Sequence, residues 1–241
     1  MDIAETMNKV ACVVGAAGGL GSCFAEVCLQ KGYRVIGGDR EDNAKTSRLT
    51  ELHGERFFFR TVNIGNPDSV AAFADWAKQS VGHIDLLLNA AGMYTPNSDK
   101  LFEEFDIEQS FETYNINALG PLRIIQQLIP LVAASQDKVV INISSEAASM
   151  SAPVMLPWRY DYGMAKAALN LATTTLQRHY KPQGVKFLLL HPGWMRTDMG
   201  GPNAMVDPMD SASGIFSLAD YTKHRLDDSI FFDYNGTPRP W

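Results

Sequence analysis

The sequence predicts a doubly wound parallel α/β fold, with about seven strands flanked by helices in a single domain over residues 1–241. Short apolar runs alternate with stretches of helical spacing along the whole chain, which is typical of parallel strands joined by crossover helices. A glycine-rich turn directly follows the first apolar run. Several polar residues come directly after later runs, so we expect them at the carboxyl edge of the sheet, where ligands of such folds bind.

The expected elements follow each other without an internal linker, repeat or low-complexity tract. Asn66 can cap a helix whose first turn suits Pro67. We expect Pro130 to strain the end of the long fourth helix or to end it. Strands are predicted over 9–14, 34–38, 57–62, 84–89, 138–143, 185–190 and 229–233. Helices are predicted over 19–31, 43–52, 67–80, 108–133, 160–180 and 210–225.

The turn after the first strand has the spacing Gly-x-x-x-Gly-x-Gly, formed by Gly15, Gly19 and Gly21. A strand, a glycine turn and a helix together let backbone N–H groups and the positive helix end bind a pyrophosphate. Asp39 ends the second strand, about twenty residues later, where a carboxylate accepts hydrogen bonds from ribose hydroxyls. This order of elements predicts a dinucleotide site.

Tyr162 and Lys166 are four residues apart, so on a helix the phenol and the ammonium emerge side by side. A nearby cation favours the phenolate, so we expect Lys166 to lower the pKa of Tyr162 and to make it useful as an acid and base. The apolar run 139–141 is followed by Ser144 and Ser145, whose hydroxyls would lie at the carboxyl end of a strand beside Tyr162.

Together these motifs resemble the short-chain dehydrogenase/reductase family, from about Lys9 to the C-terminus, and the resemblance implies a Rossmann-type fold. It implies a catalytic tetrad of Asn117, Ser145, Tyr162 and Lys166, with Ser144 as the alternative register for the serine, because the gap to Tyr162 is longer than usual. Tyr162 would protonate the developing alkoxide, Ser145 would orient the oxygen, and Asn117 would anchor a water-linked relay to Lys166.

The resemblance also implies a bound NAD(P), with NAD preferred over NADP. Asp39 would accept from the ribose 2′-hydroxyl and repel a 2′-phosphate, whereas Arg40 would attract that phosphate. The residues assigned to the cofactor are Gly15, Ala17, Gly19, Leu20, Gly21, Asp39, Arg40, Asn63, Ile64, Asn89, Ala90, Ala91, Gly92, Tyr162, Lys166, Pro192, Gly193, Trp194, Met195 and Thr197.

The predicted activity is hydride transfer between nicotinamide and a small-molecule carbonyl or secondary alcohol. The runs 191–202 and 231–236 are similar to the C-factor-like branch of the family, so the alternative is a non-catalytic dinucleotide-binding signalling protein. Residues 194–225 form the expected substrate-loop region. Methionine, aromatic and leucine side chains near the site predict an apolar pocket. They are Met93, Met150, Met155, Met195, Met199, Met205, Met209, Tyr94, Leu156, Trp158 and Trp194. Arg159 and Arg196 are the exceptions, because a guanidinium turned inward would select a carboxylate.

Composition points to a cytoplasmic protein. The net charge of −6 disfavours nucleic acid, and no run of apolar residues or signal peptide indicates a membrane partner. Three cysteines and five histidines lack metal-ligand spacing, so we expect no metal site and buried free thiols at Cys12, Cys23 and Cys28. The resemblance implies a homodimer or homotetramer that pairs through 108–133 and 160–180, with apolar candidates at Leu122, Ile125, Ile129 and Val132.

Overall fold

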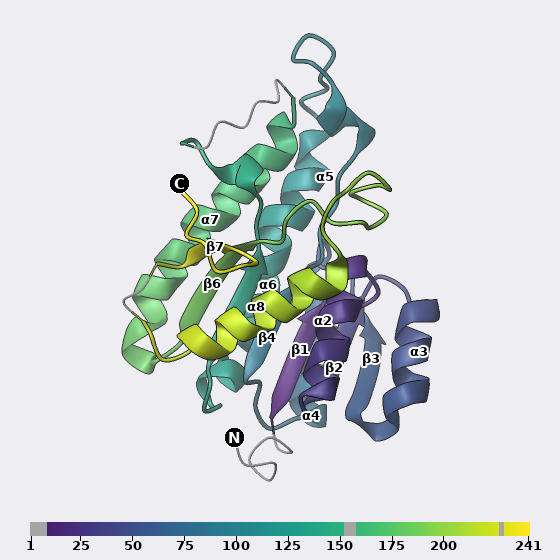
Figure 1. Cartoon of the computed structure of the whole chain (residues 1–241), viewed down its shortest axis with the longest axis vertical. Coiled ribbons are helices and arrows are strands. Elements are labelled where there is room, and N and C mark those ends of the chain that lie inside the picture. The colour runs from purple at the N-terminus through teal and green to yellow at the C-terminus, as the bar shows by residue number, and fades with distance from the viewer. Residues whose placement is uncertain (1–8, 152–157, 227–228) are drawn as a thin grey trace.

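The computed structural model describes residues 9–151, 158–226 and 229–241, and its centre is a seven-stranded parallel sheet (Figure 1). The strand order is β3-β2-β1-β4-β5-β6-β7, with the reversal between β1 and β4. This order is the doubly wound arrangement predicted from the sequence. The strands are β1 (Val10–Val14), β2 (Arg34–Asp39), β3 (Phe57–Thr61), β4 (Leu86–Asn89), β5 (Val139–Ile143), β6 (Lys186–His191) and β7 (Phe231–Asp233).

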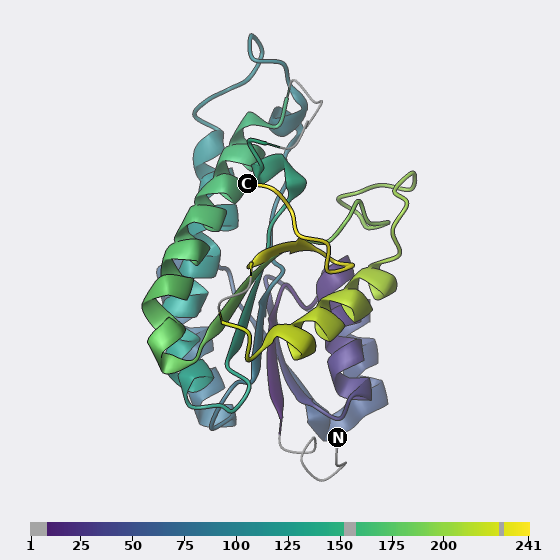
Figure 2. The same cartoon turned by 60° about the vertical axis from the view of Figure 1, so that its left-hand side comes forward.

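Helices cover both faces of the sheet (Figure 2). One core lies between the sheet and α2, α3 and α8, and it contains Phe24, Leu49 and Ile215. The other core lies under α4 and α6, and α7 packs on the same side through Leu176. The α-helices are α2 (Gly19–Gln30), α3 (Ala44–His53), α4 (Pro67–Ser80), α5 (Ser110–Tyr114), α6 (Gly120–Ala133), α7 (Tyr160–Tyr180) and α8 (Pro208–Thr222).

The predicted elements are confirmed within three residues at each end, and the predicted start of α4 is confirmed in detail. The Asn66 side chain accepts hydrogen bonds from the N–H groups of Asp68 and Ser69, and Pro67 occupies the first turn. Pro130 does not end α6, which continues to its predicted end at Ala133. Pro130 is exposed in the last turn, so water can replace the hydrogen bond that its missing N–H cannot make.

The predicted helix 108–133 is three consecutive pieces, because a π-helical turn, η3 (Asn115–Leu119), separates α5 from α6. By length and composition, Ser110–Ala133 is apolar enough to cross a membrane, although the sequence showed no such span. Half of its apolar window is buried inside the protein, and α6 packs on the second core. This burial is typical of a core helix of a globular domain.

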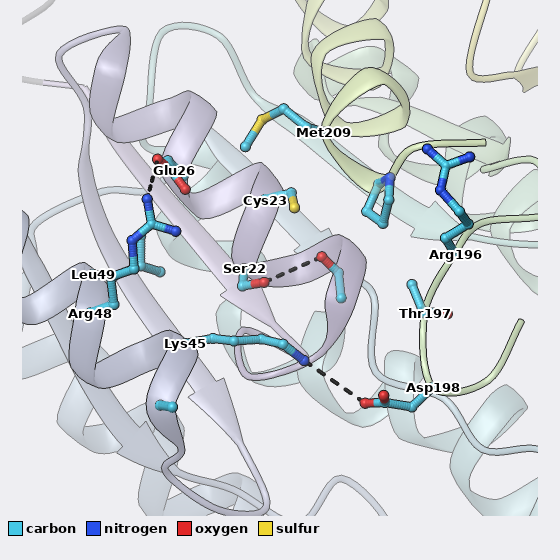
Figure 3. A pocket seen from close by; sticks show the side chains of 13 residues that line it. Ser22, Cys23, Glu26, Lys45, Arg48, Leu49, Arg196, Thr197, Asp198 and Met209 are labelled. Atoms are coloured by element: carbon cyan, nitrogen blue, oxygen red, sulfur yellow. Dashed lines mark hydrogen bonds and ion pairs between the residues drawn. The ribbon is translucent and has the colours of Figure 1, made fainter. Parts of the chain in front are cut away.

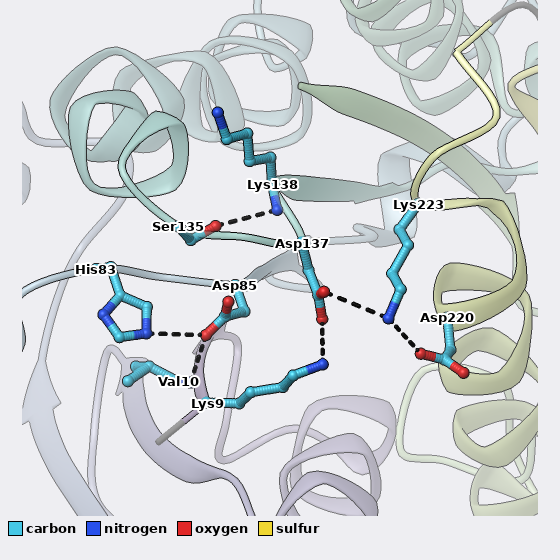
Figure 4. A network of polar contacts seen from close by, with 9 residues as sticks. All are labelled: Lys9, Val10, His83, Asp85, Ser135, Asp137, Lys138, Asp220 and Lys223. Carbon is cyan, nitrogen blue, oxygen red and sulfur yellow. Dashed lines mark hydrogen bonds and ion pairs between the residues drawn. The ribbon is translucent and has the colours of Figure 1, made fainter. Parts of the chain in front are cut away.

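A network of charged groups joins the amino ends of the strands (Figure 4). Asp137 is 5% exposed and lies 2.8 Å from the Lys9 ammonium and 3.3 Å from the Lys223 ammonium. Lys223 also contacts Asp220, at 2.9 Å. Burial alone raises the pKa of Asp137, but the hydrogen bonds and charges of the two lysines outweigh it, and the pKa lies below the ordinary aspartate value. The network connects β1, the start of β5 and the end of α8.

We expect Asp137→Asn to lower the free energy of unfolding by about 2 kcal/mol near neutral pH, because both lysines lose a buried ionised partner. Since the folded-state pKa of Asp137 is depressed, its contribution is present above the unfolded value of about 3.9 and is lost as the pH falls through the lower folded value. Chemical denaturation of both proteins across this range measures the difference.

The matched control is Asp75→Asn, which removes an exposed pair with Lys78 at 3.3 Å on α4. We expect it to change stability by less than about 0.5 kcal/mol. The stabilising role of ionised Asp137 is contradicted if Asp137→Asn lowers the free energy of unfolding no more than Asp75→Asn does. It is also contradicted if the loss for Asp137→Asn is undiminished in acid.

Candidate active site

The glycine turn after β1 is packed closely at three positions, Gly15, Gly19 and Gly21. A Cβ on Gly21 would lie 2.0 Å from the Gly15 carbonyl oxygen, and one on Gly15 would lie 2.5 Å from the Ala91 nitrogen. Gly15 also has a φ of +97°, which favours glycine. A Cβ on Gly19 would lie 2.4 Å from the Thr197 side chain. The turn therefore brings the start of α2 against both the end of β4 and the segment after β6.

Asp39 lies at the edge of this turn. One carboxylate oxygen accepts from the Ala17 N–H at 3.0 Å, and the other accepts from the Arg40 N–H at 2.7 Å. The Asn43 side chain donates to the Ala17 carbonyl at 3.0 Å. The Arg40 side chain is exposed beside them. Asp39 thus positions the turn as well as providing the carboxylate predicted for the ribose.

The segment Asn89–Gly92 continues the same edge. The N–H groups of Ala90 and Ala91 both donate to the Val14 carbonyl, at 2.8 and 3.0 Å. The Asn89 amide nitrogen donates to Asn142 at 2.8 Å, while its oxygen is buried without a hydrogen-bond partner among the described residues. An orphaned buried acceptor next to a turn without side chains fits a ligand that donates hydroxyl groups.

Asn63 and Ile64 follow β3 at this edge. The Asn63 side chain accepts from the Gly65 N–H at 3.0 Å, and the Ile64 carbonyl accepts from Arg123 at 3.1 Å. Ile64 packs against Gly120, where a Cβ would lie 2.6 Å from the Ile64 side chain. The cradle of the glycine turn, the Asp39 carboxylate and the orphaned Asn89 oxygen together fit a nicotinamide dinucleotide.

Tyr162 lies in the first turn of α7, against the turn that follows β5. Gly163 makes this approach possible, because a Cβ there would lie 3.1 Å from the Ala147 carbonyl oxygen. Ser145 lies close enough to the Tyr162 hydroxyl to lower the pKa of Tyr162. Ser144 points elsewhere, donating to the Asn170 side chain at 2.6 Å. The structure therefore brings Ser145, not Ser144, to Tyr162.

The expected lowering of the Tyr162 pKa is not found. Burial raises the pKa of Tyr162, and the Ser145 hydrogen bond and the charge of Arg159 only partly offset this, so the pKa lies above the ordinary value. The Lys166 ammonium lies 5.8 Å from the centre of the Tyr162 ring. Burial lowers the pKa of Lys166 itself to about 8. The low-dielectric surroundings that the sequence prediction left out explain the difference.

Lys166 and Asn117 meet at Gly92. Lys166 is 4% exposed, and its ammonium donates to the Ile143 carbonyl at 2.8 Å. The Asn117 amide bonds to both backbone groups of Met93, at 2.8 and 3.1 Å. A Cβ on Gly92 would lie 2.8 Å from the Asn117 oxygen and 3.8 Å from the Lys166 nitrogen. All four predicted tetrad residues are therefore close together, and the water-linked relay remains a prediction.

Two supporting features were missed by the sequence prediction. Asn117 lies in the π-helical turn, a distortion frequent at functional sites, and the predicted helix gave no signal for it. The other feature is a cluster behind Ser145, where the Glu146 N–H donates to His191 Nδ1 at 3.3 Å and Arg239 pairs with Glu146 at 2.9 Å. Burial lowers the pKa of His191. His191 thus fixes the turn that carries Ser145.

The segment after β6 folds back on itself. Pro192 is buried and Gly193 has a φ of +78°. Trp194 is half exposed and donates to the Gly200 carbonyl at 2.8 Å. Met195 packs on the first core. The Arg196 guanidinium pairs with Asp207 at 3.1 Å and also donates to the Met205 carbonyl at 2.9 Å.

A cavity of about 460 Å³ lies between this segment, α2 and α3 (Figure 3). Lys45 and Asp198 approach across its mouth at 3.9 Å, and half-buried Cys23 lines it. Cys12 and Cys28 are buried free thiols, as predicted. Among the methionines predicted for a pocket, Met209 also lines the cavity. Met150, Met199 and Met205 are exposed, and the predictions for Met155 and Leu156 lie outside the described residues.

Comparison with known proteins agrees with this geometry. Residues 9–205 match the family described as short chain dehydrogenase. The chain belongs to the short-chain dehydrogenase family. It is 36% identical over 160 residues to the C-signal of Myxococcus xanthus, covering 66% of this chain and 94% of that protein.

Two solved structures are similar over almost the whole chain. A Burkholderia multivorans short-chain dehydrogenase/reductase with bound NADP has 26% identity and a TM-score of 0.86, covering 97% of this chain and 100% of that one. A Pseudomonas aeruginosa carbonyl reductase has 29% identity and a TM-score of 0.84, with the same coverage. The protein is therefore an NAD(P)-dependent oxidoreductase, and this function is favoured over a non-catalytic signalling role.

Proposed function

We propose that this short-chain dehydrogenase interconverts a small-molecule carbonyl compound and its secondary alcohol, with Tyr162 as the general acid and base. The observation that carries the proposal is the placing of Tyr162 beside Ser145, which lowers its pKa, and beside buried Lys166, whose ammonium lies 5.8 Å from the Tyr162 ring centre. A dinucleotide-binding protein without catalysis needs the glycine turn but has no use for this arrangement. The carbonyl reductase among the similar structures supports the same class of substrate.

Tyr162, Ser145 and Lys166 have separate roles at the carbonyl oxygen of the substrate. When bound, the nicotinamide supplies a hydride to the carbonyl carbon or accepts one from the alcohol. The raised pKa keeps Tyr162 protonated at neutral pH, so its hydroxyl is ready to donate to a developing alkoxide. Ser145 orients that oxygen and shares its charge. The Lys166 ammonium stabilises the tyrosinate that remains after the proton has left.

The cofactor that we propose is NAD. The Asp39 carboxylate lies at the glycine turn through its bond to Ala17, where its charge disfavours a 2′-phosphate. The opposing feature is Arg40, which is exposed beside it, and a similar structure contains NADP. A negative charge fixed at the turn outweighs a mobile exposed guanidinium, because the like charge is already in place before binding.

A homodimer or homotetramer is the assembly that we propose. Three of the predicted contact residues, Ile125, Ile129 and Val132, are buried in the core and face the sheet instead. Other apolar side chains of the same helices point outward. They are Phe111 at 68% exposure, Tyr114 at 41%, Leu119 at 40%, Met164 at 55% and Leu171 at 72%. α5 packs beside α7. We propose that a second copy covers these exposed apolar side chains.

Tyr162→Phe should lower the rate of carbonyl reduction by at least about 100-fold, because the ring remains and the transferable proton is lost. Cofactor affinity, measured by fluorescence titration, should be almost unchanged. Tyr180→Phe at the other end of α7 is the control and should keep full activity. A Tyr162→Phe protein that retains turnover, purified free of host dehydrogenases, rejects Tyr162 as the general acid.

NADH should bind at least about tenfold more tightly than NADPH. This ratio corresponds to about 1.4 kcal/mol of repulsion between the Asp39 carboxylate and the 2′-phosphate. Fluorescence titration of both reduced cofactors measures it. Asp39→Ser should reduce the difference between the two affinities, because it removes the charge that repels NADPH. Asp75→Ser on α4 should leave that difference unchanged. Tighter binding of NADPH to the unaltered protein overturns the choice of NAD.

Sedimentation at micromolar concentration should show a dimer or tetramer. Replacing Phe111 and Leu171 together by Asp should yield monomers, because two charges would have to be buried in the contact. Leu52→Asp on α3 places a charge at a similarly exposed leucine, 58% exposed, and should leave the assembly intact. A monomeric unaltered protein refutes this assembly.

A further inference from the structure

Arg159 has an unusual backbone conformation directly before the helix that carries Tyr162. Its φ is +72°, in the left-handed region, and among the described residues only Lys138 shares a positive φ without being glycine. Its N–H donates to the Ser98 carbonyl at 2.8 Å, and its carbonyl accepts from the Gly163 N–H at 2.8 Å. A strained conformation held from both sides fixes where the side chain leaves the backbone.

The Arg159 side chain extends toward Tyr94, which packs against Tyr162. Its Nε donates to the Tyr94 hydroxyl at 3.1 Å, and that hydroxyl donates to Asp99 at 2.6 Å. The Tyr94 and Tyr162 rings meet edge to face, with centres 5.4 Å apart. The Arg159 charge lowers the pKa of Tyr162, so it acts at the catalytic hydroxyl. Arg159 therefore contacts the ring that packs against Tyr162.

The guanidinium keeps most of its hydrogen-bonding capacity. Over residues 9–151, 158–226 and 229–241, no carboxylate lies within ion-pair distance of Arg159, and its two terminal nitrogens make no recorded hydrogen bond. Other arginines near the site are paired: Arg196 with Asp207 and Arg239 with Glu146. The Asp99 carboxylate accepts a hydrogen bond from the Tyr94 hydroxyl and makes no ion pair with Arg159. Arg159 is thus a half-buried cation held in place by Tyr94. Its two terminal guanidinium nitrogens remain available to bind a ligand.

We propose that Arg159, steadied by Tyr94, binds an oxoanion of the substrate, so that the enzyme acts on carbonyl compounds bearing a carboxylate or a phosphate. A planar guanidinium binds such groups through two parallel hydrogen bonds. The Arg159 carbon lies 5.5 Å from the Tyr94 ring centre, and that ring adjoins Tyr162. A charged group a few bonds from the carbonyl reaches Arg159 while the carbonyl oxygen meets Tyr162. This substrate class differs from the apolar compounds expected from the sequence, and the two remain alternatives for the test.

The inference rests on the proposed reduction of carbonyl compounds, and the test separates the two. Phenylpyruvate is compared with its methyl ester and with phenylacetone, which keep the aromatic carbonyl framework and lack the carboxylate. Dihydroxyacetone phosphate is compared with dihydroxyacetone as the phosphate arm. Each pair is assayed with unaltered protein, Arg159→Asn, Arg159→Lys and Arg178→Asn. Asparagine tolerates the left-handed conformation, so Arg159→Asn removes the charge without adding strain.

For at least one anionic substrate, Arg159→Asn should lower kcat/KM by about 10- to 100-fold, mostly through KM, as expected for a lost charge-assisted pair. For the matched neutral substrate, kcat/KM should change by less than about threefold. A general structural defect would lower kcat/KM for both substrates. Arg159→Lys should restore part of the loss. Arg178→Asn, on the exposed far end of α7, should behave as the unaltered protein.

The pattern of loss identifies the anion: an effect on phenylpyruvate alone supports a carboxylate, and one on dihydroxyacetone phosphate alone supports a phosphate. Equal losses for anionic and neutral substrates, or none for either, overturn the inference while leaving carbonyl reduction intact. If no carbonyl substrate turns over, the binding of phenylpyruvate tests the role of Arg159. Phenylpyruvate should then still raise the melting temperature of the cofactor-loaded protein and not that of Arg159→Asn, and equal shifts overturn the inference.

Discussion

The site depends on the close approach of two turns, the one after β1 and the one after β4. The Val14 carbonyl accepts from both Ala90 and Ala91, and Gly15 leaves no room for a side chain beside Ala91. The contact fixes the cofactor turn to the segment that ends at Gly92. Gly92 in turn lies against Asn117 and Lys166. A displacement of the first contact therefore moves the cofactor turn relative to the proton-donating residues.

The sequence could predict the elements and the tetrad because their signals are local. Alternating apolar runs determine β1 to β7, and a spacing of four residues places Tyr162 and Lys166 on one helix face. The π-helical turn at Asn117 could not be predicted, since it depends on packing against β4 and α7. For the same reason the sequence could not tell that Ile125 and Ile129 face the sheet while Phe111 and Leu171 face outward.

The pKa of Tyr162 was mispredicted for a related reason. Helical spacing shows that a cation is near, but it does not show how much water surrounds the pair. In the structure burial acts on both partners, raising the pKa of Tyr162 and lowering that of Lys166 to about 8. Burial opposes the charged form of each group, so proximity alone does not produce a tyrosinate. The charge that lowers the Tyr162 pKa comes from Arg159, outside the motif.

Arg159 links substrate binding to the protonation of Tyr162. With the guanidinium open to solvent, its charge partly offsets the burial that raises the Tyr162 pKa. An oxoanion bound there neutralises that charge, so the pKa of Tyr162 rises further in the complex. A higher pKa holds the proton on Tyr162 until negative charge develops on the carbonyl oxygen. The same arrangement lowers the fraction of Tyr162 present as the tyrosinate that accepts a proton in alcohol oxidation.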